Sequence, residues 1–363
     1  MSEVTSPLPL PAFKGSTVRV SVMDAGHLVA PSAIFVQSPK PGHDTVDVPT
    51  YSFLVENERV GKKVLFELGI MKAWKEKLPH LVSMVQSVGG TINVTEDVPD
   101  KLNAASVSLS SINFAIWSHH HPDHTGDLTL FPTSTSLIVG PGFKSHPSTY
   151  PGQPLGPNAE TLHEAFEGRE VIELDFGSSA STPKIAGLRA IDWFDDGSFY
   201  LLEAPGHTAD HIMALARTSA DKFVLLAGDG AHHCGEIRPT PLTPLPDTIS
   251  PSPFEPPTSA SSCPSSLFQS IHPSPEPFRI TPFYEVAAHH IDDPVARRAT
   301  LDAVKAFDAS PDVLVVLTHD ASLLDVLEFF PKAGLVGWEK QPSRKDMGRW
   351  RFLQDFRKGV LKE

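Results

Sequence analysis

AIWSHHHPDHTGDL, residues 115–128, places four histidines and two aspartates directly after a short apolar run. On an extended segment, side chains two residues apart point the same way, so His119 and His121 can face one metal ion. Asp123 and His124 come on the turn that follows and can face a second point nearby. The spacing His-x-His-x-Asp-His therefore offers two pairs of ligands to two adjacent ions. Imidazole and carboxylate ligands suit zinc, and iron or manganese also accept them.

Three further candidate ligands each follow a predicted apolar strand. His207 follows FYLLEA, Asp229 follows FVLLA, and His319 follows VLVVL. Together with the stretch at 119–124, four separate strands are predicted to end at a metal-type ligand. Functional groups are commonly carried on loops held by a rigid scaffold, and side chains at the same end of neighbouring strands can converge. One such histidine alone also fits a packing or capping role, but the ordered set of seven candidates favours a metal centre.

Length, composition and charge restrict the class of protein. The chain has 363 residues, enough for one large domain or two small ones. With 40% hydrophobic and 20% charged residues it matches a globular protein rather than a membrane-embedded or disordered one. The net charge of -13 repels phosphate backbones, so nucleic acid is not an expected partner. No apolar run approaches the roughly 20 residues that span a bilayer, so no membrane association is expected either.

The two cysteines and the N-terminal residues bear on the compartment. Two cysteines in a chain of this length do not make a disulfide framework, which favours a reducing environment. The first 16 residues lack the basic start and apolar core of a signal peptide. We therefore expect a cytoplasmic protein. The sequence leaves the oligomeric state open.

The pattern along the chain predicts one mixed domain over residues 17–363, preceded by a loose arm at 1–16. Strand and helix patterns mix in both halves, which favours a layered αβ sandwich over a doubly wound sheet. A helix is predicted at 294–308, with an aspartate as N-cap and a proline in its first turn. Further helices are predicted at 321–330 and near the C-terminus. Strand patterns lie at 17–26, 50–57, 62–69, 112–119, 136–142, 189–208 as a hairpin, 222–230 and 312–320.

Residues 239–282 interrupt this pattern because they are dense in proline and serine. Proline lacks the backbone donor that a ladder or helix needs, so a partly extended surface insertion is predicted. Two interpretations remain open for it. It is either a flexible spacer or a lid over a pocket.

The ordered ligand set resembles the metallo-β-lactamase superfamily. The resemblance is carried by HHHPDH at 119–124, PGHT at 205–208, GD at 228–229 and THD at 318–320, and it covers roughly residues 17–340. It implies an α/β fold, a four-layer αβ/βα sandwich that holds two metal ions, normally zinc. In that family pattern, His119, His121 and His207 hold the first ion, Asp123, His124 and His319 hold the second, and Asp229 bridges both.

Such a pair of ions predicts a hydrolase. Two cations that flank a bridging water lower its pKa and provide hydroxide near neutral pH. Asp123 is expected to be both a ligand and the proton carrier to the leaving group. The HxHxDH form, Asp229 in place of a cysteine, and the final THD look most like the lactonase-type branch. The predicted reaction is the opening of a small-molecule lactone, or of a cyclic amide or carbamate (lactam).

Two alternatives to this reaction remain. The first is a thioesterase that acts on an acyl thioester, of the glyoxalase II or carrier-protein type. The second is a metal-binding protein without catalysis.

One departure from the lactonase pattern concerns the substrate. Lactonases of this type carry a tyrosine a few residues after the bridging aspartate, whereas this chain has no tyrosine there. His232 or His233 is therefore a candidate substrate contact, and Arg238 is another. Glu67 is predicted to be a carboxylate behind the ligands. The histidine pair at 289–290 is predicted to be ordinary surface or packing residues.

Overall fold

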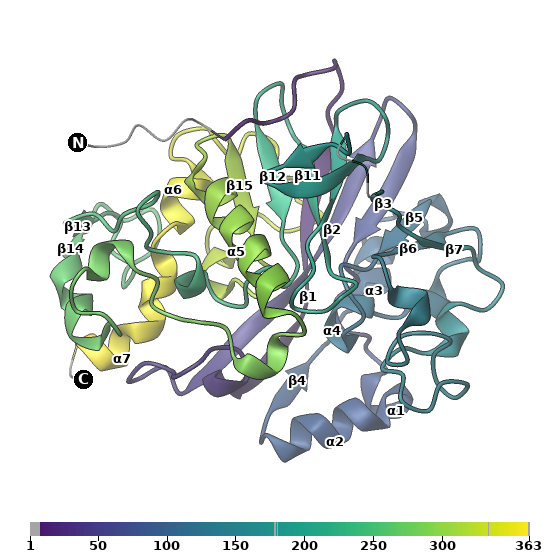
Figure 1. Ribbon diagram of the computed structural model, residues 1–363, viewed down its shortest axis with the longest axis horizontal. Helices are drawn as coiled ribbons and strands as arrows, with labels where there is room; N and C mark the ends of the chain where they lie inside the picture. Colours follow the sequence, from purple (N-terminus) through teal and green to yellow (C-terminus); the bar gives the residue numbers. More distant parts are fainter. Residues whose placement is uncertain (1–7, 178, 180, 333, 362–363) are drawn as a thin grey trace.

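The computed structural model describes residues 8–177, 179, 181–332 and 334–361, and two large β-sheets lie at its centre (Figure 1). The strands of the first sheet are β1 (Arg19–Pro31), β2 (Thr45–Asn57), β3 (Lys62–Phe66), β4 (Thr91–Asn93), β5 (Phe114–Ile116), β6 (Ser136–Val139) and β7 (Val171–Glu173). They lie in the order β4-β1-β2-β3-β5-β6-β7. The strands from β3 through β5 and β6 to β7 run parallel, and the other pairs are antiparallel.

The second sheet follows in the chain and has the order β15-β12-β11-β10-β9-β8. Its strands are β8 (Lys184–Ile185), β9 (Leu188–Asp192), β10 (Phe199–Glu203), β11 (Ile212–Arg217), β12 (Phe223–Leu226) and β15 (Val313–Val316). All neighbours are antiparallel except β12 and β15. The predicted hairpin at 189–208 is confirmed as β9 and β10, and β11 is a strand that the sequence analysis did not predict.

The main core lies between the two sheets. Side chains of β1, β2, β3 and β5 meet side chains of β10, β11, β12 and β15 there. Alternate residues point to opposite faces of a strand, so in β12 Val224 and Leu226 face the other sheet while Phe223 and Leu225 face outward. Both faces of β12 are buried, which explains its continuous apolar sequence.

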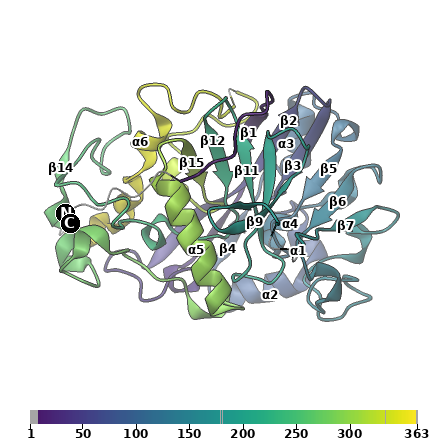
Figure 2. The ribbon, with the colours of Figure 1, turned by 45° about the horizontal axis from the view of Figure 1, so that its top comes forward.

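Helices cover the outer faces of both sheets and complete four layers. The helices are α1 (Trp74–Lys77), α2 (Pro79–Ser87), α3 (Val98–Ala104), α4 (Pro122–Thr125), α5 (Pro294–Ala309), α6 (Arg344–Gly348) and α7 (Arg357–Val360). Helix α3 packs on the first sheet and α5 on the second, beside β15 in both views (Figures 1 and 2). Helix α5 begins as predicted, since the Asp293 carboxylate accepts the N–H groups of Val295 and Ala296. The predicted αβ/βα sandwich is confirmed.

The helix predicted at 321–330 is wrong. Only a single 3-10 turn forms there, at Ala321–Leu323, capped by the Asp320 carboxylate. The chain then runs along β1, and the N–H groups of Phe330 and Leu335 donate to the carbonyl groups of Val22 and Val20. Tertiary pairing with an edge of the first sheet therefore overrides the local helical spacing.

The proline-rich segment 239–282 packs into the scaffold. It contains the short pair β13 (Thr248–Ile249) and β14 (Cys263–Pro264) and a 3-10 helix at Ser265–Ile271. Phe268 is fully buried and joins Phe283 and the C-terminal residues Phe352 and Phe356 in one apolar cluster. This proline-rich backbone forms only one short ladder, and the segment is held to the scaffold mainly by its buried aromatic side chains.

Among the residues that the structure describes, no helix combines the length and the apolar character needed to cross a bilayer.

Candidate active site

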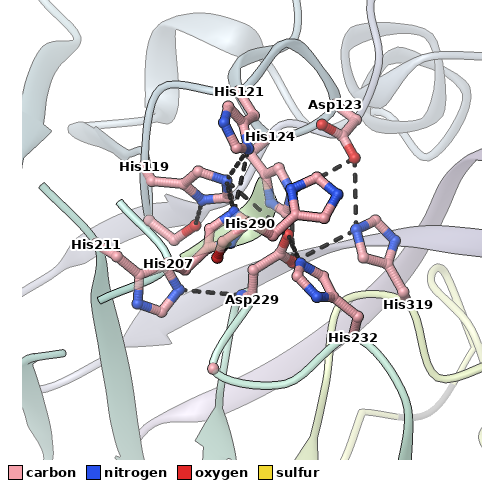
Figure 3. A network of polar contacts seen from close by, with 12 residues as sticks. His119, His121, Asp123, His124, His207, His211, Asp229, His232, His290 and His319 are labelled. Carbon is pink, nitrogen blue, oxygen red and sulfur yellow. Dashed lines mark hydrogen bonds and ion pairs between the residues drawn. The ribbon is translucent and has the colours of Figure 1, made fainter. Parts of the chain in front are cut away.

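Seven side chains converge where strands of both sheets end (Figure 3). His119 follows β5, His207 follows β10, Asp229 follows β12, and His319 follows β15. The potential ligand atoms of these seven residues fall into two groups, and the atoms of each group all lie within 4.8 Å of one another. The first group is His119, His121, His207 and Asp229, and the second is Asp123, His124 and His319. The structure thus brings together every residue of the predicted ligand set.

Backbone geometry explains how the 119–124 stretch supplies both groups. His121 is still extended, with φ -63° and ψ 146°, and Pro122 then begins the single turn of α4. The turn ends at Gly126 with φ +51°, where a Cβ would lie 2.5 Å from the Cβ of Leu68. Only glycine fits such a close approach in this conformation. The strand end therefore presents His119 and His121, and the turn presents Asp123 and His124.

The first group has three ring nitrogens in mutual contact. His119 Nε2 lies 2.9 Å from His121 Nδ1, and His207 Nε2 lies 3.1 Å from both. Burial and the neighbouring imidazoles lower the pKa of His119 well below its usual range, and burial does the same for His207. The rings are therefore neutral at pH 7. His207 Nδ1 faces the carbonyl oxygen of His290 at 3.3 Å and carries its proton there, so its Nε2 lone pair points into the group.

The second group also points ring nitrogens inward. His124 Nδ1 donates to Glu67 Oε2 at 2.7 Å, and His319 Nδ1 donates to the carbonyl oxygen of Pro49 at 2.9 Å. Although burial opposes it, the carboxylates of Glu67, Asp229 and Asp123 raise the pKa of His124 well above its usual range. This group therefore favours an added positive charge. Glu67 holds a ligand candidate from behind, as the sequence predicted.

Asp229 lies between the two groups. Its Oδ2 is 3.4 Å from His207 Nε2 and 3.9 Å from His119 Nε2. Its Oδ1 is 3.5 Å from His124 Nε2 and 3.4 Å from His319 Nε2. One carboxylate oxygen thus faces each group, which is the arrangement of a bridging ligand.

The residues present fit metal ions. His124 Nε2 and Asp229 Oδ1 are buried and have no hydrogen-bond partner. Buried polar atoms without a partner cost free energy unless a ligand satisfies them. Ring nitrogens that point inward, in rings whose outer nitrogen is fixed by a hydrogen-bond partner, are typical of metal-binding histidines. Nitrogen and carboxylate donors suit divalent transition metals.

His211 is a supporting residue that sequence reasoning missed. Its Nδ1 donates to the carbonyl oxygen of Ala204 at 2.8 Å, and its Nε2 accepts the N–H of Asp229 at 3.0 Å. It therefore fixes the backbone of Asp229. The second histidine of HTADH, four residues after His207, is the sequence signal for it. His120 points away from the groups to Asp210, with Nδ1 2.8 Å from Oδ1.

The three predicted substrate contacts have different positions. His232 lies in the site, with Nε2 3.2 Å from Asp229 Oδ2 and neither ring nitrogen hydrogen-bonded. His233 points the other way, because its Nε2 lies 3.0 Å from Asp355 Oδ2 and its Nδ1 accepts the N–H of Gly235. It serves as the N-cap of the 3-10 helix Cys234–Glu236.

Arg238 does not reach the site either. Its Nε and Nη2 donate to the two oxygens of Asp308 at 3.0 and 2.7 Å, and its Nη1 donates to the carbonyl oxygen of Arg349. All of these partners lie within the scaffold around α5 and the C-terminal residues. The predictions for His233 and Arg238 as substrate contacts do not fit these positions, because both side chains are committed to structural partners.

His290 enters the site although the sequence assigned it to surface or packing. Its ring lies 4.8 Å from the ring of His232 and 5.5 Å from that of His207. Its Nε2 is buried without a hydrogen-bond partner, and burial with the neighbouring imidazoles lowers its pKa. The doubled histidine before the N-cap of α5 was the available signal, but its position depends on how the loop before α5 folds back.

The site opens into a cavity of about 390 Å³, a size that suits a small molecule. One side of the cavity is lined by residues of the two ligand groups and by His232 and His290; the ligand-group residues are His121, Asp123, Asp229 and His319. The other side is apolar and is formed by β1, the turn after it, α2 and β4. Its main apolar side chains are Leu28, Ile34, Phe35, Leu81, Met84, Val85, Val88 and Ile92. No residue of 239–282 lines this cavity, so the lid interpretation of the proline-rich segment finds no support.

Comparison with known proteins places the chain in a family. No protein-family model matches it. It is 38% identical over 367 residues to Gamma-lactamase FDB1 of Fusarium pseudograminearum, covering 98% of this chain and 87% of the relative. It is 37% identical over 369 residues to Metallo-hydrolase mfmC of Annulohypoxylon moriforme, covering 98% and 93%. A solved N-acyl homoserine lactone hydrolase has the same fold, with a TM-score of 0.57 at 15% identity over 87% of this chain and 99% of that one.

The fold and the paired groups define a metal-dependent hydrolase. The chain belongs to the metallo-β-lactamase superfamily, together with these gamma-lactamase and metallo-hydrolase relatives, and it shares its fold with a lactone hydrolase.

Proposed function

We propose that the protein opens a small lactone or lactam ring by hydrolysis, with two zinc ions held by the seven-residue cluster. The observation that carries the proposal is the position of Asp229, one oxygen toward each group of histidines. The relative named a gamma-lactamase supports a cyclic amide as substrate, and the structural neighbour named a lactone hydrolase supports a cyclic ester. Iron or manganese would fit the same donors.

The chain's own residues hold and orient the ions. His119, His121 and His207 would hold the first ion, and Asp123, His124 and His319 the second, with Asp229 shared. When bound, such a pair supplies a water with a pKa near neutrality and positive charge for a developing oxyanion. Glu67 and His211 keep His124 and Asp229 in the required orientation through their hydrogen bonds.

Asp123 is the proposed proton carrier. Its Oδ2 faces His124 and His319 at 3.5 and 3.4 Å, and its side chain, at 19% exposure, also lines the cavity. In the reaction, water oxygen bonds to the ring carbonyl carbon and the ring C–O or C–N bond breaks. One proton of that water passes through the Asp123 carboxylate to the leaving oxygen or nitrogen, and the product is a hydroxy acid or an amino acid.

His232 and His290 are proposed to contact the substrate. Both residues line the cavity and have a buried Nε2 without a hydrogen-bond partner, and His232 Nε2 lies 3.2 Å from Asp229 Oδ2. A neutral imidazole offers one N–H donor, which suits a ring carbonyl. His232 thus takes the place at which lactonases of this branch carry a tyrosine.

We also propose that the protein acts in the cytoplasm. Both cysteines, Cys234 and Cys263, are free thiols, as expected in a reducing compartment.

A hydrolysis panel tests the proposal. Zinc-loaded protein is assayed on lactones, lactams, cyclic carbamates and thioesters, with Asp123→Asn as the matched variant. We expect turnover of at least one cyclic ester or amide, and loss of turnover in the variant even when metal is retained. Thioester hydrolysis alone would replace this proposal with the thioesterase alternative. Full activity of metal-loaded Asp123→Asn would remove the proton-carrier role.

A further inference from the structure

A second cavity, here called the α5 pocket, lies between α5 and the segment that leads into it. Its volume is about 570 Å³, within the range of small-molecule sites. One wall is the face of α5 that carries Arg297, Arg298 and Lys305, and the opposite wall is formed by residues 281–286 and Lys40. None of the seven cluster residues lines it, so it is separate from the candidate active site.

Lys40 brings a largely buried side chain to this pocket, and its ammonium group has no anionic partner. The residue is 9% exposed, and its Nζ lies 5.3 Å from the centroid of the Tyr284 ring. Within the described part of the chain, no carboxylate or carbonyl oxygen pairs with this ammonium group. Burial lowers its pKa. A partly desolvated charge without a partner costs free energy, which an anion in the pocket would offset.

The α5 side of the pocket adds further positive charge. Lys305 is half-buried, burial lowers its pKa, and its nearest carboxylate oxygen, on Asp302, is 3.9 Å away. Arg297 is 3% exposed and its Nε is buried without a hydrogen-bond partner. The one buried carboxylate that lines the pocket, Glu236, is already paired with Arg297 Nη2 at 3.1 Å. The buried groups of the pocket therefore have an excess of cations.

We propose that the α5 pocket binds a small organic carboxylate, with its charged group between Lys40 and Lys305 and its apolar body against Phe283, Val286 and Leu301. Glu285 and Asp302 at the exposed rim oppose a doubly charged ligand, so a single carboxylate fits better than a phosphate dianion. The inference does not rest on the proposed hydrolysis.

Two residues that line the pocket, Arg297 and Glu236, are hydrogen-bonded to the loop that carries Asp229. Arg297 Nη1 donates to the carbonyl oxygens of Asp229 and Gly230 at 2.9 and 2.8 Å. Its partner Glu236 accepts the N–H groups of His232 and His233 through Oε1. Changing Arg297 would therefore disturb the loop that carries Asp229. The lysines are the better positions to change, because neither contacts that loop through a hydrogen bond.

Calorimetric titration of zinc-loaded protein with benzoate and with hexanoate tests the proposal. Benzamide serves as the uncharged counterpart of benzoate. We expect at least one carboxylate to bind, benzamide not to bind, and Lys40→Met and Lys305→Met each to weaken binding by about tenfold, the scale of one lost charge pair. Lys332→Met is the matched control, since this exposed lysine does not line the pocket.

Two results would overturn the proposal. One is the absence of binding by both carboxylates to the unaltered protein. The other is binding that survives both lysine substitutions but is lost in Asp123→Ala, which would assign the carboxylate to the metal cavity. Because Lys40 is buried, its variant is checked by thermal unfolding, and Lys305→Met, at a half-buried position, keeps the test valid if Lys40→Met does not fold.

Discussion

The metal cluster and the proline-rich segment differ in how their buried side chains find partners. Both lie outside the two large sheets, and both bring together side chains from distant parts of the chain. In the cluster, polar atoms are left without partners inside a buried site, as at Asp229 Oδ1 and His232 Nε2. In the segment 239–282, aromatic side chains such as Phe268 are satisfied by packing. Buried polar atoms without a hydrogen-bond partner therefore gather in the functional region, whereas aromatic packing dominates the segment 239–282, where the buried Thr243 Oγ1 also has no hydrogen-bond partner.

Removing the bridge should have the largest effect. In Asp229→Asn, one charged oxygen is lost between the two groups, so we expect bound metal to fall and kcat/KM to drop by about 10⁴-fold, the scale seen when a central catalytic group is removed. Metal analysis and kinetics on the same preparation measure both. Asp210→Asn is the control, since Asp210 contacts His120 outside the groups. Normal metal content with full activity in Asp229→Asn would show that Asp229 is needed neither for metal binding nor for the reaction.

Truncation in the proline-rich segment should affect stability and leave the metal in place. Phe268→Ala removes a fully buried ring and should lower the free energy of unfolding by about 3–5 kcal/mol. Leu242→Ala, 44% exposed in the same segment, should change it by less than about 0.5 kcal/mol. Denaturant titration measures the difference. A Phe268→Ala protein with normal stability and altered KM would instead restore the lid interpretation.

Weakening a supporting contact should have an intermediate effect. Glu67→Gln keeps the shape of the side chain but removes the negative charge of the carboxylate that accepts the hydrogen bond from His124 Nδ1. Metal affinity at the second group should fall by about 10–100-fold, as for other partners of metal-bound histidines. Competition with a chelator measures it, and Glu170→Gln, at an exposed carboxylate, is the control. Unchanged affinity would mean that His124 is oriented by packing alone.

A smaller effect is expected from His27 on β1, away from the cluster. Its Nε2 contacts Asp24 and its Nδ1 contacts Asp47, at 3.1 and 2.7 Å. The hydrogen bond to Asp24, opposed by partial burial, raises the pKa of His27 to about 9. The folded protein thus keeps a proton that the unfolded chain releases. The resulting stabilisation is complete below about pH 6.5 and is lost as pH rises through 9.

His27→Gln should therefore destabilise the protein at pH 6 and become neutral near pH 10. Because the ring is partly exposed, the effect should stay below about 1 kcal/mol. Melting temperatures across this pH range measure it, with the exposed His80→Gln as control. A difference that grows with rising pH would have the wrong sign for this contact.

The sequence predicted the parts of the fold and site that depend on local order. Each strand that carries a ligand has a continuous apolar run, so its end and the polar residue after it are visible along the chain. His119, His121, Asp123 and His124 need only one strand end and one turn. The αβ layering follows from the same strand and helix patterns.

The side-chain positions that the sequence did not predict depend on contacts between distant parts of the chain. Arg238 pairs with Asp308, which comes from the end of α5, 70 positions later in the chain. His233 and His232 are adjacent, yet the N-cap of a 3-10 helix turns one ring away from the site. His290 reaches the cavity only because the loop before α5 folds back over His207. A local sequence pattern does not show which distant segments will come into contact, so these positions could not be predicted from it.

We propose above that the two groups hold two metal ions bridged by Asp229. The most direct test of this proposal is the metal content per chain, measured by elemental analysis on protein purified without added metal and again after zinc loading, for the unaltered chain and for His319→Ala. We expect two ions per zinc-loaded chain and one in His319→Ala, since the first group lacks that residue. Fewer than two ions in the zinc-loaded chain, or two in His319→Ala, would contradict it.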